Sequence, residues 1–192
     1  MTTEELNTLK DRAYKTVVEH GFHEDVKPDA FYLGLVMSEA GEAINADRKG
    51  LHADAKGFEE DEANGLQFAE NFKKHVKDSV EDEIADIVIR LLDFAGLKGY
   101  ELSTDEYLDS FILSALEELK TSGLPGLLLI FIYALSYNSR FHDLEKCVCR
   151  TIRIISGCFD KMTGGSDKDL WWFVEKKMRF NKQRPMLNGK KY

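Results

Sequence analysis

Apolar residues recur along most of the chain at spacings of three and four, which is the period of an α-helix rather than the alternation of a strand. At the start of the chain, Leu6, Leu9 and Ala13 fall on one such face, and Gly21 stands where a helix would end. Only three prolines interrupt the 192 residues. The pattern therefore predicts an all-α protein.

Glycine-containing and polar breaks divide the pattern into seven expected helices. The acidic stretch 51–78 has too few aromatic residues to define a buried face, so we expect it to be a loop or a lid. The expected helices begin with one from about residue 6 to 18, and continue with 31–48, 80–97, 103–120, the apolar segment after Gly126, 143–161 and a last one ending near 183.

Composition narrows the class of protein. The formal net charge of −8 opposes a phosphate backbone, which argues against nucleic acid as a partner. The three cysteines, Cys147, Cys149 and Cys158, lie in one expected helix and do not resemble a disulfide framework, which favours a reducing compartment. The N-terminal residues lack an apolar signal core, and the apolar run 127–135 is too short to cross a bilayer. We therefore expect a cytoplasmic protein without a membrane partner.

Two pairs of acidic residues have helical spacing. Glu39 and Glu42 are three residues apart in the second expected helix, and Glu83 and Asp86 have the same spacing in the third. Each pair projects from one face of its helix, and antiparallel packing of the two helices would bring four carboxylates together. The same spacing also fits a solvated helix face with local ion pairs, so the neighbouring sequence has to decide between the two interpretations.

A cluster of four carboxylates is unstable without cations, because like charges in a partly desolvated site raise one another's pKa. Oxygen ligands select hard ions such as Mg²⁺, with Mn²⁺ as a substitute. No histidine stands three residues after any of these carboxylates, which disfavours the Glu-x-x-His motifs of di-iron bundles. Mg²⁺ retains waters and binds phosphate oxygens, so a polyphosphate is the ligand expected on its other side.

Three segments around these residues occur in an order that resembles the MazG-like family of all-α NTP pyrophosphohydrolases. Weaker similarity near Gly21-Phe22, Asp47-Arg48 and Gly189-Lys190-Lys191 extends the resemblance to about residues 6–97 and the last twenty or so. The three segments are Leu35-Val36-Met37-Ser38-Glu39-Ala40-Gly41-Glu42-Ala43, Glu83-Ile84-Ala85-Asp86-Ile87-Val88-Ile89-Arg90 and Lys177-x3-Asn181-x2-Arg184-Pro185.

The resemblance implies a role for each matching residue. The carboxylates that would hold magnesium, and so serve as catalytic residues, are Glu39, Glu42, Glu83 and Asp86. The side chains that would contact the substrate, through its phosphates, are Lys177, Asn181 and Arg184. Lys and Arg suit polyphosphate chemically, although cations at a helix end also favour the helix dipole without any ligand. Arg48, Lys190 and Lys191 are weaker candidates for the same task.

The chain departs from the family pattern in two places. Some members precede the first glutamate with another acid, where this chain has Ser38, so the group that activates the water is undecided. About sixty residues also separate the third expected helix from the Lys-x3-Asn motif, whereas the family usually joins them directly. A tandem duplication of a four-helix-bundle-type unit would account for the second departure.

The duplication is expected at an offset of 63 residues, with unit 1 at about 1–122 and unit 2 at about 123–192 of a single domain. This offset places Lys146 and Cys149 opposite Glu83 and Asp86. The segment 121–142, where the copy of the first carboxylate pair should lie, contains no acidic residue, so the second unit is not expected to hold magnesium. One unit would then supply metal ligands and the other the basic substrate contacts of a single site.

The resemblance implies hydrolysis of an NTP or dNTP to the monophosphate and pyrophosphate by magnesium-activated water. The alternative is a catalytically inactive helical module that binds nucleotides or other proteins. A homo-oligomer fits either interpretation.

Trp171, Trp172 and Phe173 are candidates for stacking on a nucleobase, but aromatic residues at helical spacing more often pack in a core.

Overall fold

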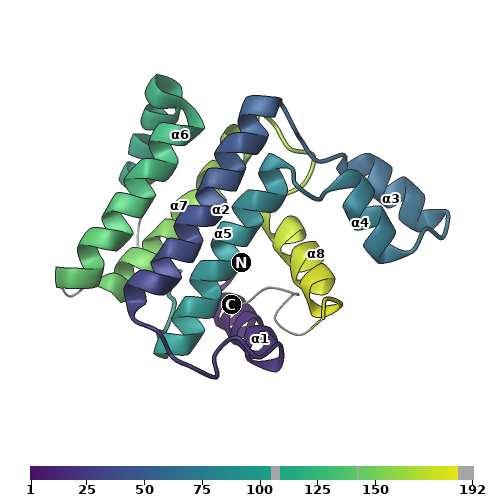
Figure 1. Ribbon diagram of the computed structural model, residues 1–192. Coiled ribbons are helices and arrows are strands. Elements are labelled where there is room, and N and C mark those ends of the chain that lie inside the picture. Colours follow the sequence, from purple (N-terminus) through teal and green to yellow (C-terminus); the bar gives the residue numbers. More distant parts are fainter. Residues whose placement is uncertain (105–108, 142, 186–192) are drawn as a thin grey trace.

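The structure, a computed structural model, describes residues 1–104, 109–141 and 143–185. Helices account for 77% of these residues, and none of these ranges contains a strand, which confirms the all-α prediction. Figure 1 shows how the helices assemble around α5. The eight helices are α1 (Thr3–Glu19), α2 (Asp29–Lys49), α3 (Ala55–Ala63), α4 (Phe68–His75), α5 (Val80–Lys98), α6 (Asp109–Phe141), α7 (Leu144–Met162) and α8 (Leu170–Lys182).

Helices α2 and α5 form the central pair. The Ser79 side chain caps α5 by accepting a hydrogen bond from the backbone of Asp82, and Gly50 ends α2 in the left-handed region at φ 64°. The backbone N–H of Val80 donates to the carbonyl of Leu51 over 2.9 Å, so the end of α2 meets the start of α5. The two helices are therefore antiparallel, as the carboxylate pattern requires (Figure 1).

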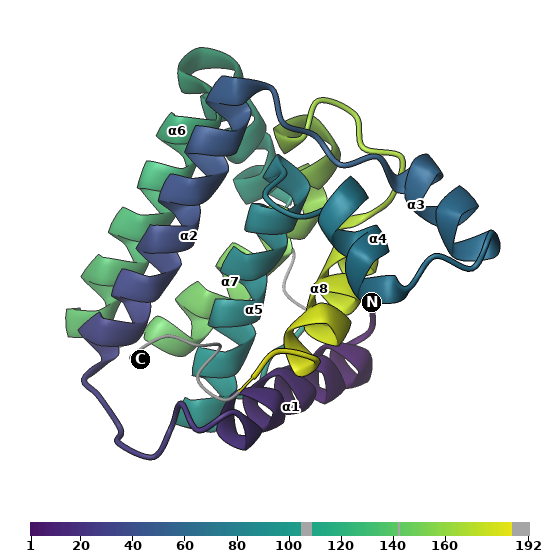
Figure 2. The ribbon, with the colours of Figure 1, turned by 45° about the vertical axis from the view of Figure 1, so that its right-hand side comes forward.

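Helices α1 and α8 pack against the other side of α5 (Figure 2). α1 begins with a capping box in which Thr2 and Glu5 bond each other's backbone N–H groups. The two helices are joined to each other by Arg12, whose guanidinium donates two hydrogen bonds of 2.7 Å to the carboxylate of Glu175. A cavity between α1, α2, α5 and α8 is thereby enclosed on several sides.

Close contact between α1 and α5 requires a glycine at Gly96. A Cβ atom at this position would lie 2.5 Å from the Cβ of Tyr14, so the helices would have to move apart. We expect Gly96→Ala to lower the free energy of unfolding by about 1–3 kcal/mol, measured by urea denaturation. The control is Gly34→Ala in α2, where a Cβ meets nothing within 4 Å and helix propensity favours alanine. Equal effects of the two substitutions would contradict this account.

The expectation of a loop at 51–78 is wrong, because this stretch contains α3 and α4. Its aromatic side chains are buried: Phe58 and Phe72 have no exposed surface, and Phe72 stacks on Phe180 of α8 at 4.5 Å between ring centroids. Asn71 joins the two short helices by donating a hydrogen bond of 2.8 Å to the carbonyl of Phe58. Trp172 packs edge-on against Phe58, which gives this tryptophan a core role.

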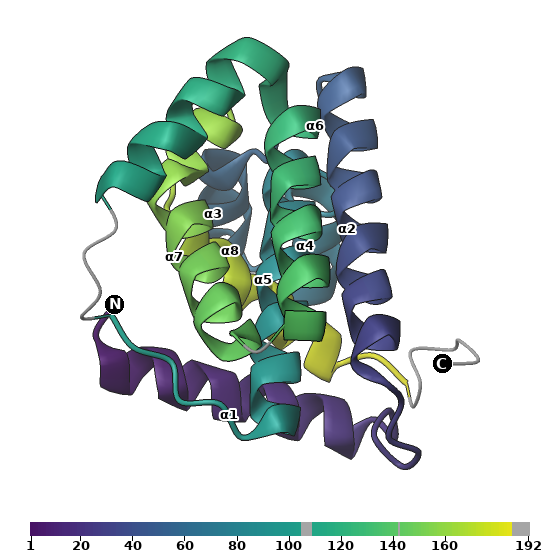
Figure 3. The same ribbon diagram turned by 90° about the vertical axis from the view of Figure 1, so that its left-hand side faces the viewer.

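The expected fourth and fifth helices are the two halves of α6. Gly123, at φ 66° and ψ −171°, is non-helical, so the chain turns back there and forms a helical hairpin (Figure 3). By length and composition alone, residues 110–140 are apolar enough to cross a membrane, with 28% of the most apolar window buried inside the structure. Because the hairpin interrupts this segment, its apolar residues do not form one straight span. The expected start near Ser103 lies partly outside the described residues.

Candidate functional site

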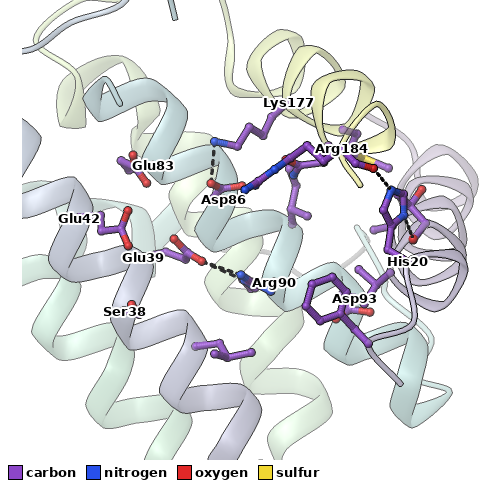
Figure 4. A pocket seen from close by; sticks show the side chains of 18 of the residues that line it. His20, Ser38, Glu39, Glu42, Glu83, Asp86, Arg90, Asp93, Lys177 and Arg184 are labelled. Atoms are coloured by element: carbon purple, nitrogen blue, oxygen red, sulfur yellow. Dashed lines mark hydrogen bonds and ion pairs between the residues drawn. The ribbon is translucent and has the colours of Figure 1, made fainter. Parts of the chain in front are cut away.

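The four predicted metal ligands line one cavity of about 350 Å³. Glu39 and Glu42 come from α2, and Glu83 and Asp86 come from the facing surface of α5 (Figure 4). Ligand oxygens of Glu39, Glu83 and Asp86 lie within 4.8 Å of one another, whereas Glu42 is more exposed at the side of the cavity. The antiparallel packing expected from the sequence thus brings the acidic pairs together.

The three predicted substrate contacts line the same cavity from α8 and the residues after it. Six carboxylates and four cations surround the space, so the balance of charge is negative. The carboxylates are those of Glu39, Glu42, Asp78, Glu83, Asp86 and Asp93, and the cations are those of Lys77, Arg90, Lys177 and Arg184.

Arg90 holds the first glutamate in place. Its Nε and Nη2 atoms both lie 3.0 Å from Oε1 of Glu39, across the contact between α5 and α2. Burial raises the pKa of Glu39, and Asp86 adds to this shift, while Arg90 opposes it. The segment containing Arg90 was recognised in the sequence, but its position four residues after Asp86 gave no indication of this ion pair.

Lys177 is bonded inside the carboxylate cluster. Its ammonium donates to both oxygens of Asp82 at 2.8 Å and lies 2.7 Å from Oδ2 of Asp86. Asp82 and Asp86 are four residues apart, so they share a face of α5 and both reach the same lysine. Lys177 and Asp82 are almost fully buried. The two carboxylates raise the pKa of Lys177 even though burial acts in the opposite direction. Sequence analysis had not identified Asp82.

Burial destabilises the ionised form of the acidic side chains in the cluster. It raises the pKa of Glu83 to about 8, a shift that Lys177 opposes and that Asp82 and Asp86 increase. Burial likewise raises the pKa of Asp82 to about 6, against the lowering effect of Lys177. A second group of carboxylate oxygens, from Asp78, Asp82 and Glu83, also lies within 4.8 Å. The cluster therefore takes up either protons or cations near neutral pH.

The donor set fits a hard divalent cation. Glu39, Glu83 and Asp86 offer oxygen atoms at a mutual distance that one ion can bridge, and no cysteine or histidine belongs to either acidic group within the described residues. Glu42 stands at the same wall of the cavity. These side chains could hold Mg²⁺ or Mn²⁺.

Asn181 and Arg184 form the opposite rim. The Oδ1 atom of Asn181 is buried and has no hydrogen-bond partner among the described residues. The carbonyl of Arg184 lies 3.1 Å from Nε2 of His20, whose Nδ1 lies 2.7 Å from the carbonyl of Thr16. These bonds attach the end of α8 to α1, and Figure 4 shows the Arg184 side chain extending into the cavity.

The weaker basic candidates do not join the site in the part of the chain that the structure describes. Arg48 is exposed near the end of α2 and does not line the cavity. Lys190 and Lys191 lie outside the described residues. Ser38, the residue before Glu39, also lines the cavity.

A second cavity of about 380 Å³ lies between the halves of α6 and α7. Three helical segments line it, and their lining residues have the same spacing along the chain as residues that line the first cavity. At each matched position where the first cavity has a charged side chain, the second cavity has a different residue. Leu35, Ser38, Glu39 and Glu42 correspond to Leu127, Ile130, Phe131 and Ala134; Glu83, Asp86 and Arg90 to Cys147, Arg150 and Ile154; Lys177, Met178 and Asn181 to Ser114, Ala115 and Glu118.

In the order given, the paired residues are 92, 64 and 63 positions apart, and in the third set the residues of the second cavity come earlier in the chain. The value of 64 also relates the bounds of α5 to those of α7, and it exceeds by one the offset expected from sequence. It places Cys147 and Arg150, instead of Lys146 and Cys149, opposite Glu83 and Asp86. The duplication itself stays a prediction.

Comparison with known proteins finds no matching family model, no matching curated protein and no matching solved structure. The resemblance to MazG-like enzymes therefore rests on the sequence segments quoted above, and the site is interpreted from its own geometry.

Proposed function

We propose that this protein is a magnesium-dependent nucleoside triphosphate pyrophosphohydrolase, which converts an NTP or dNTP to the monophosphate and pyrophosphate. One observation carries the proposal. Three carboxylates from two antiparallel helices have oxygens within 4.8 Å of one another in a cavity that Lys177 and Arg184 also line. A cavity that offers both clustered carboxylates and basic side chains suits a metal–polyphosphate ligand.

Glu39, Glu83 and Asp86 would hold the cation, with Glu42 as a further oxygen donor at the cavity wall. When bound, magnesium would lower the pKa of the attacking water and offset the negative charge of the departing pyrophosphate. The excess of carboxylates over cations around the cavity supports this assignment, because a divalent ion would neutralise it.

The surrounding side chains would orient the ligands and bind the phosphates. Arg90 fixes Glu39 by two contacts of 3.0 Å, and Lys177 fixes Asp86 by one of 2.7 Å. Because the ammonium of Lys177 is already bonded to two carboxylates, Arg184 is the better phosphate contact of the two. A guanidinium binds phosphate oxygens bidentately, and the Nδ2 group of Asn181, which lines the same cavity, would donate a hydrogen bond to the triphosphate.

We further propose that the two cavities descend from one duplicated unit, and that the second holds no metal. The matching spacings on three helical segments support common descent. Phe131, Ala134 and Cys147 replace three carboxylates of the candidate site, and Arg150 replaces the fourth with a cation. These four positions therefore offer none of the carboxylate oxygens that magnesium prefers.

Pyrophosphate release from a panel of ribo- and deoxyribonucleoside triphosphates, with and without magnesium, tests the proposed function. We expect magnesium-dependent release by the wild type and a loss of more than about 100-fold in Glu39→Gln, because disturbing even an outer partner of a metal ligand costs 10–100-fold. Glu60→Gln, an exposed change on α3, is the matched control and should retain activity.

Titration calorimetry with magnesium adds a second measurement to the same variants. The Glu39→Gln protein should lose most of its saturable magnesium binding, because it lacks one of the three close carboxylates and the second cavity contributes no binding. If the protein binds magnesium but releases pyrophosphate from no triphosphate, the result would favour a nucleotide-binding module over an enzyme. If neither occurs, the result would favour a protein-interaction module.

A further inference from the structure

The candidate cavity extends beyond the carboxylate cluster to an end with different walls. Apolar side chains from α1, α2, α5 and the segment after α1 line this end, and one acidic side chain, Asp93, stands among them (Figure 4). Asp93 follows Asp86 by seven residues, which is two helical turns, or about 10 Å along the axis of α5. The apolar residues are Ala13, Val17, Phe22, Leu35 and Ile89.

Asp93 is separate from the cluster that would hold metal. It belongs to neither group of close carboxylate oxygens, and its only recorded hydrogen bond within the described residues is to Nε2 of His23 at 2.7 Å from Oδ1. Its exposed fraction is 5%, and its side chain lines the cavity. Since His23 bonds Oδ1, the Oδ2 atom is the acceptor that remains for a molecule in the cavity.

The pair of Asp93 and His23 is held rigidly. The His23 ring stacks on Tyr14 at 5.4 Å and contacts Tyr32 at 5.7 Å, between ring centroids. The hydroxyl of Tyr32 accepts a hydrogen bond from the backbone of Lys27, which fixes the segment between α1 and α2. A hydrogen-bond acceptor with so little conformational freedom discriminates well between ligands, because its side chain cannot rotate to avoid a group that lacks a donor.

We propose that Asp93 selects the nucleobase of the substrate and favours bases that present an amino N–H, such as cytosine and adenine; this inference rests on the proposed function. The position suits a base because the apolar end lies about two turns of α5 beyond the expected phosphate site. A carboxylate only accepts hydrogen bonds, so it accepts from an amino group and repels the carbonyl oxygen found at the same place in uracil or hypoxanthine.

The test compares kcat/KM for dCTP against dUTP and for dATP against dITP, two pairs that differ at this group. We expect the wild type to prefer the amino-bearing member by at least about 100-fold, and Asp93→Asn to reduce that ratio by at least about tenfold. An asparagine amide can donate to a carbonyl, so it accommodates both members of each pair. The change should appear mainly in KM, with kcat for the preferred member altered by less than about threefold.

A purely structural role for Asp93 predicts a different result. Asp93→Asn would then lower the melting temperature and slow all four substrates by the same factor, with the ratios unchanged, and this would overturn the inference. Asp29→Asn is the control, because it also removes a carboxylate bonded to one basic side chain, here Lys98, but lies outside the cavity. It should leave both substrate ratios at their wild-type values.

Failure of the proposed function can be recognised separately. If the wild type releases no pyrophosphate from any triphosphate, that function is wrong, and the inference is then judged by titration calorimetry with dCMP and dUMP. Tighter binding of dCMP by the wild type, lost in Asp93→Asn, would support base selection by Asp93 without catalysis. Equal binding of the two, or no binding of either, would overturn it.

Discussion

Replacing Glu83 with glutamine is expected to slow pyrophosphate release by about 1,000-fold or more and to raise the melting temperature of the metal-free protein at pH 8. The loss of activity follows from the removal of a proposed metal ligand whose oxygen lies within 4.8 Å of oxygens of both Glu39 and Asp86, and it should exceed the 10–100-fold cost of disturbing an outer-shell partner. The gain in stability follows from the removal of a buried charge.

The direction of the stability effect comes from the pKa of Glu83. Burial raises this pKa to about 8 in the folded protein, against about 4.3 in an unfolded chain. The folded state binds the proton more tightly, so the stability contributed by the protonated side chain is fully present below about pH 4 and is lost as the pH rises through 8. Glutamine cannot ionise, and at pH 8 it should gain on the order of 2 kcal/mol, or about 4–8 °C.

Thermal unfolding in EDTA and in millimolar magnesium, at pH 5 and pH 8, measures both effects. In EDTA the advantage of Glu83→Gln over the wild type should be present at pH 8 and nearly absent at pH 5. Added magnesium should stabilise the wild type by mass action and leave the variant unchanged. A variant that melts below the wild type in EDTA at pH 8 would show that Glu83 does not carry this electrostatic cost.

Replacing Lys177 with methionine is expected to lower the free energy of unfolding by about 3–5 kcal/mol, because it leaves buried carboxylates without their cation. The ammonium contacts Asp82 at 2.8 Å and Asp86 at 2.7 Å, and Asp82 is 1% exposed. Methionine retains the length and much of the volume of the lysine stem, so the loss reports charge more than packing. Urea denaturation at pH 7.5 without divalent ions measures it.

The adjacent Lys176 supplies a matched control. Its ammonium lies 3.4 Å from a carboxylate oxygen of Glu62, which is 41% exposed, and pairs of this kind contribute about 0–1 kcal/mol. Lys176→Met should therefore cost much less than Lys177→Met. Adding Asp82→Asn to Lys177→Met should restore part of the lost stability, and an additive double variant would argue against a direct coupling.

The helices and the carboxylate cluster were predictable because they depend on local patterns. The expected bounds for the helices containing Glu39 and Glu83 differ from those of α2 and α5 by at most two residues. Spacing of three within each acidic pair determines a common face, and a long apolar stripe determines which side of the helix packs inward. Neither inference requires knowledge of distant residues.

What escaped prediction depends on contacts between segments far apart in the chain. The bond from Lys177 to Asp82 spans 95 residues, and the bond from Arg90 to Glu39 spans 51. Helices α3 and α4 are short, and their aromatic side chains pack against Trp172 and Phe180 of α8. Short helices have little intrinsic stability, so tertiary packing decides whether they form.

The two cavities lie in a single polypeptide, so a codon change alters one of them and leaves the other as it was. An assembly of two identical chains lacks this freedom, because each substitution enters both sites at once. Here the second cavity has Cys147 and Arg150 at the spacing that Glu83 and Asp86 have in the acidic cavity. Side chains around the second cavity can therefore change without altering the carboxylates of the first.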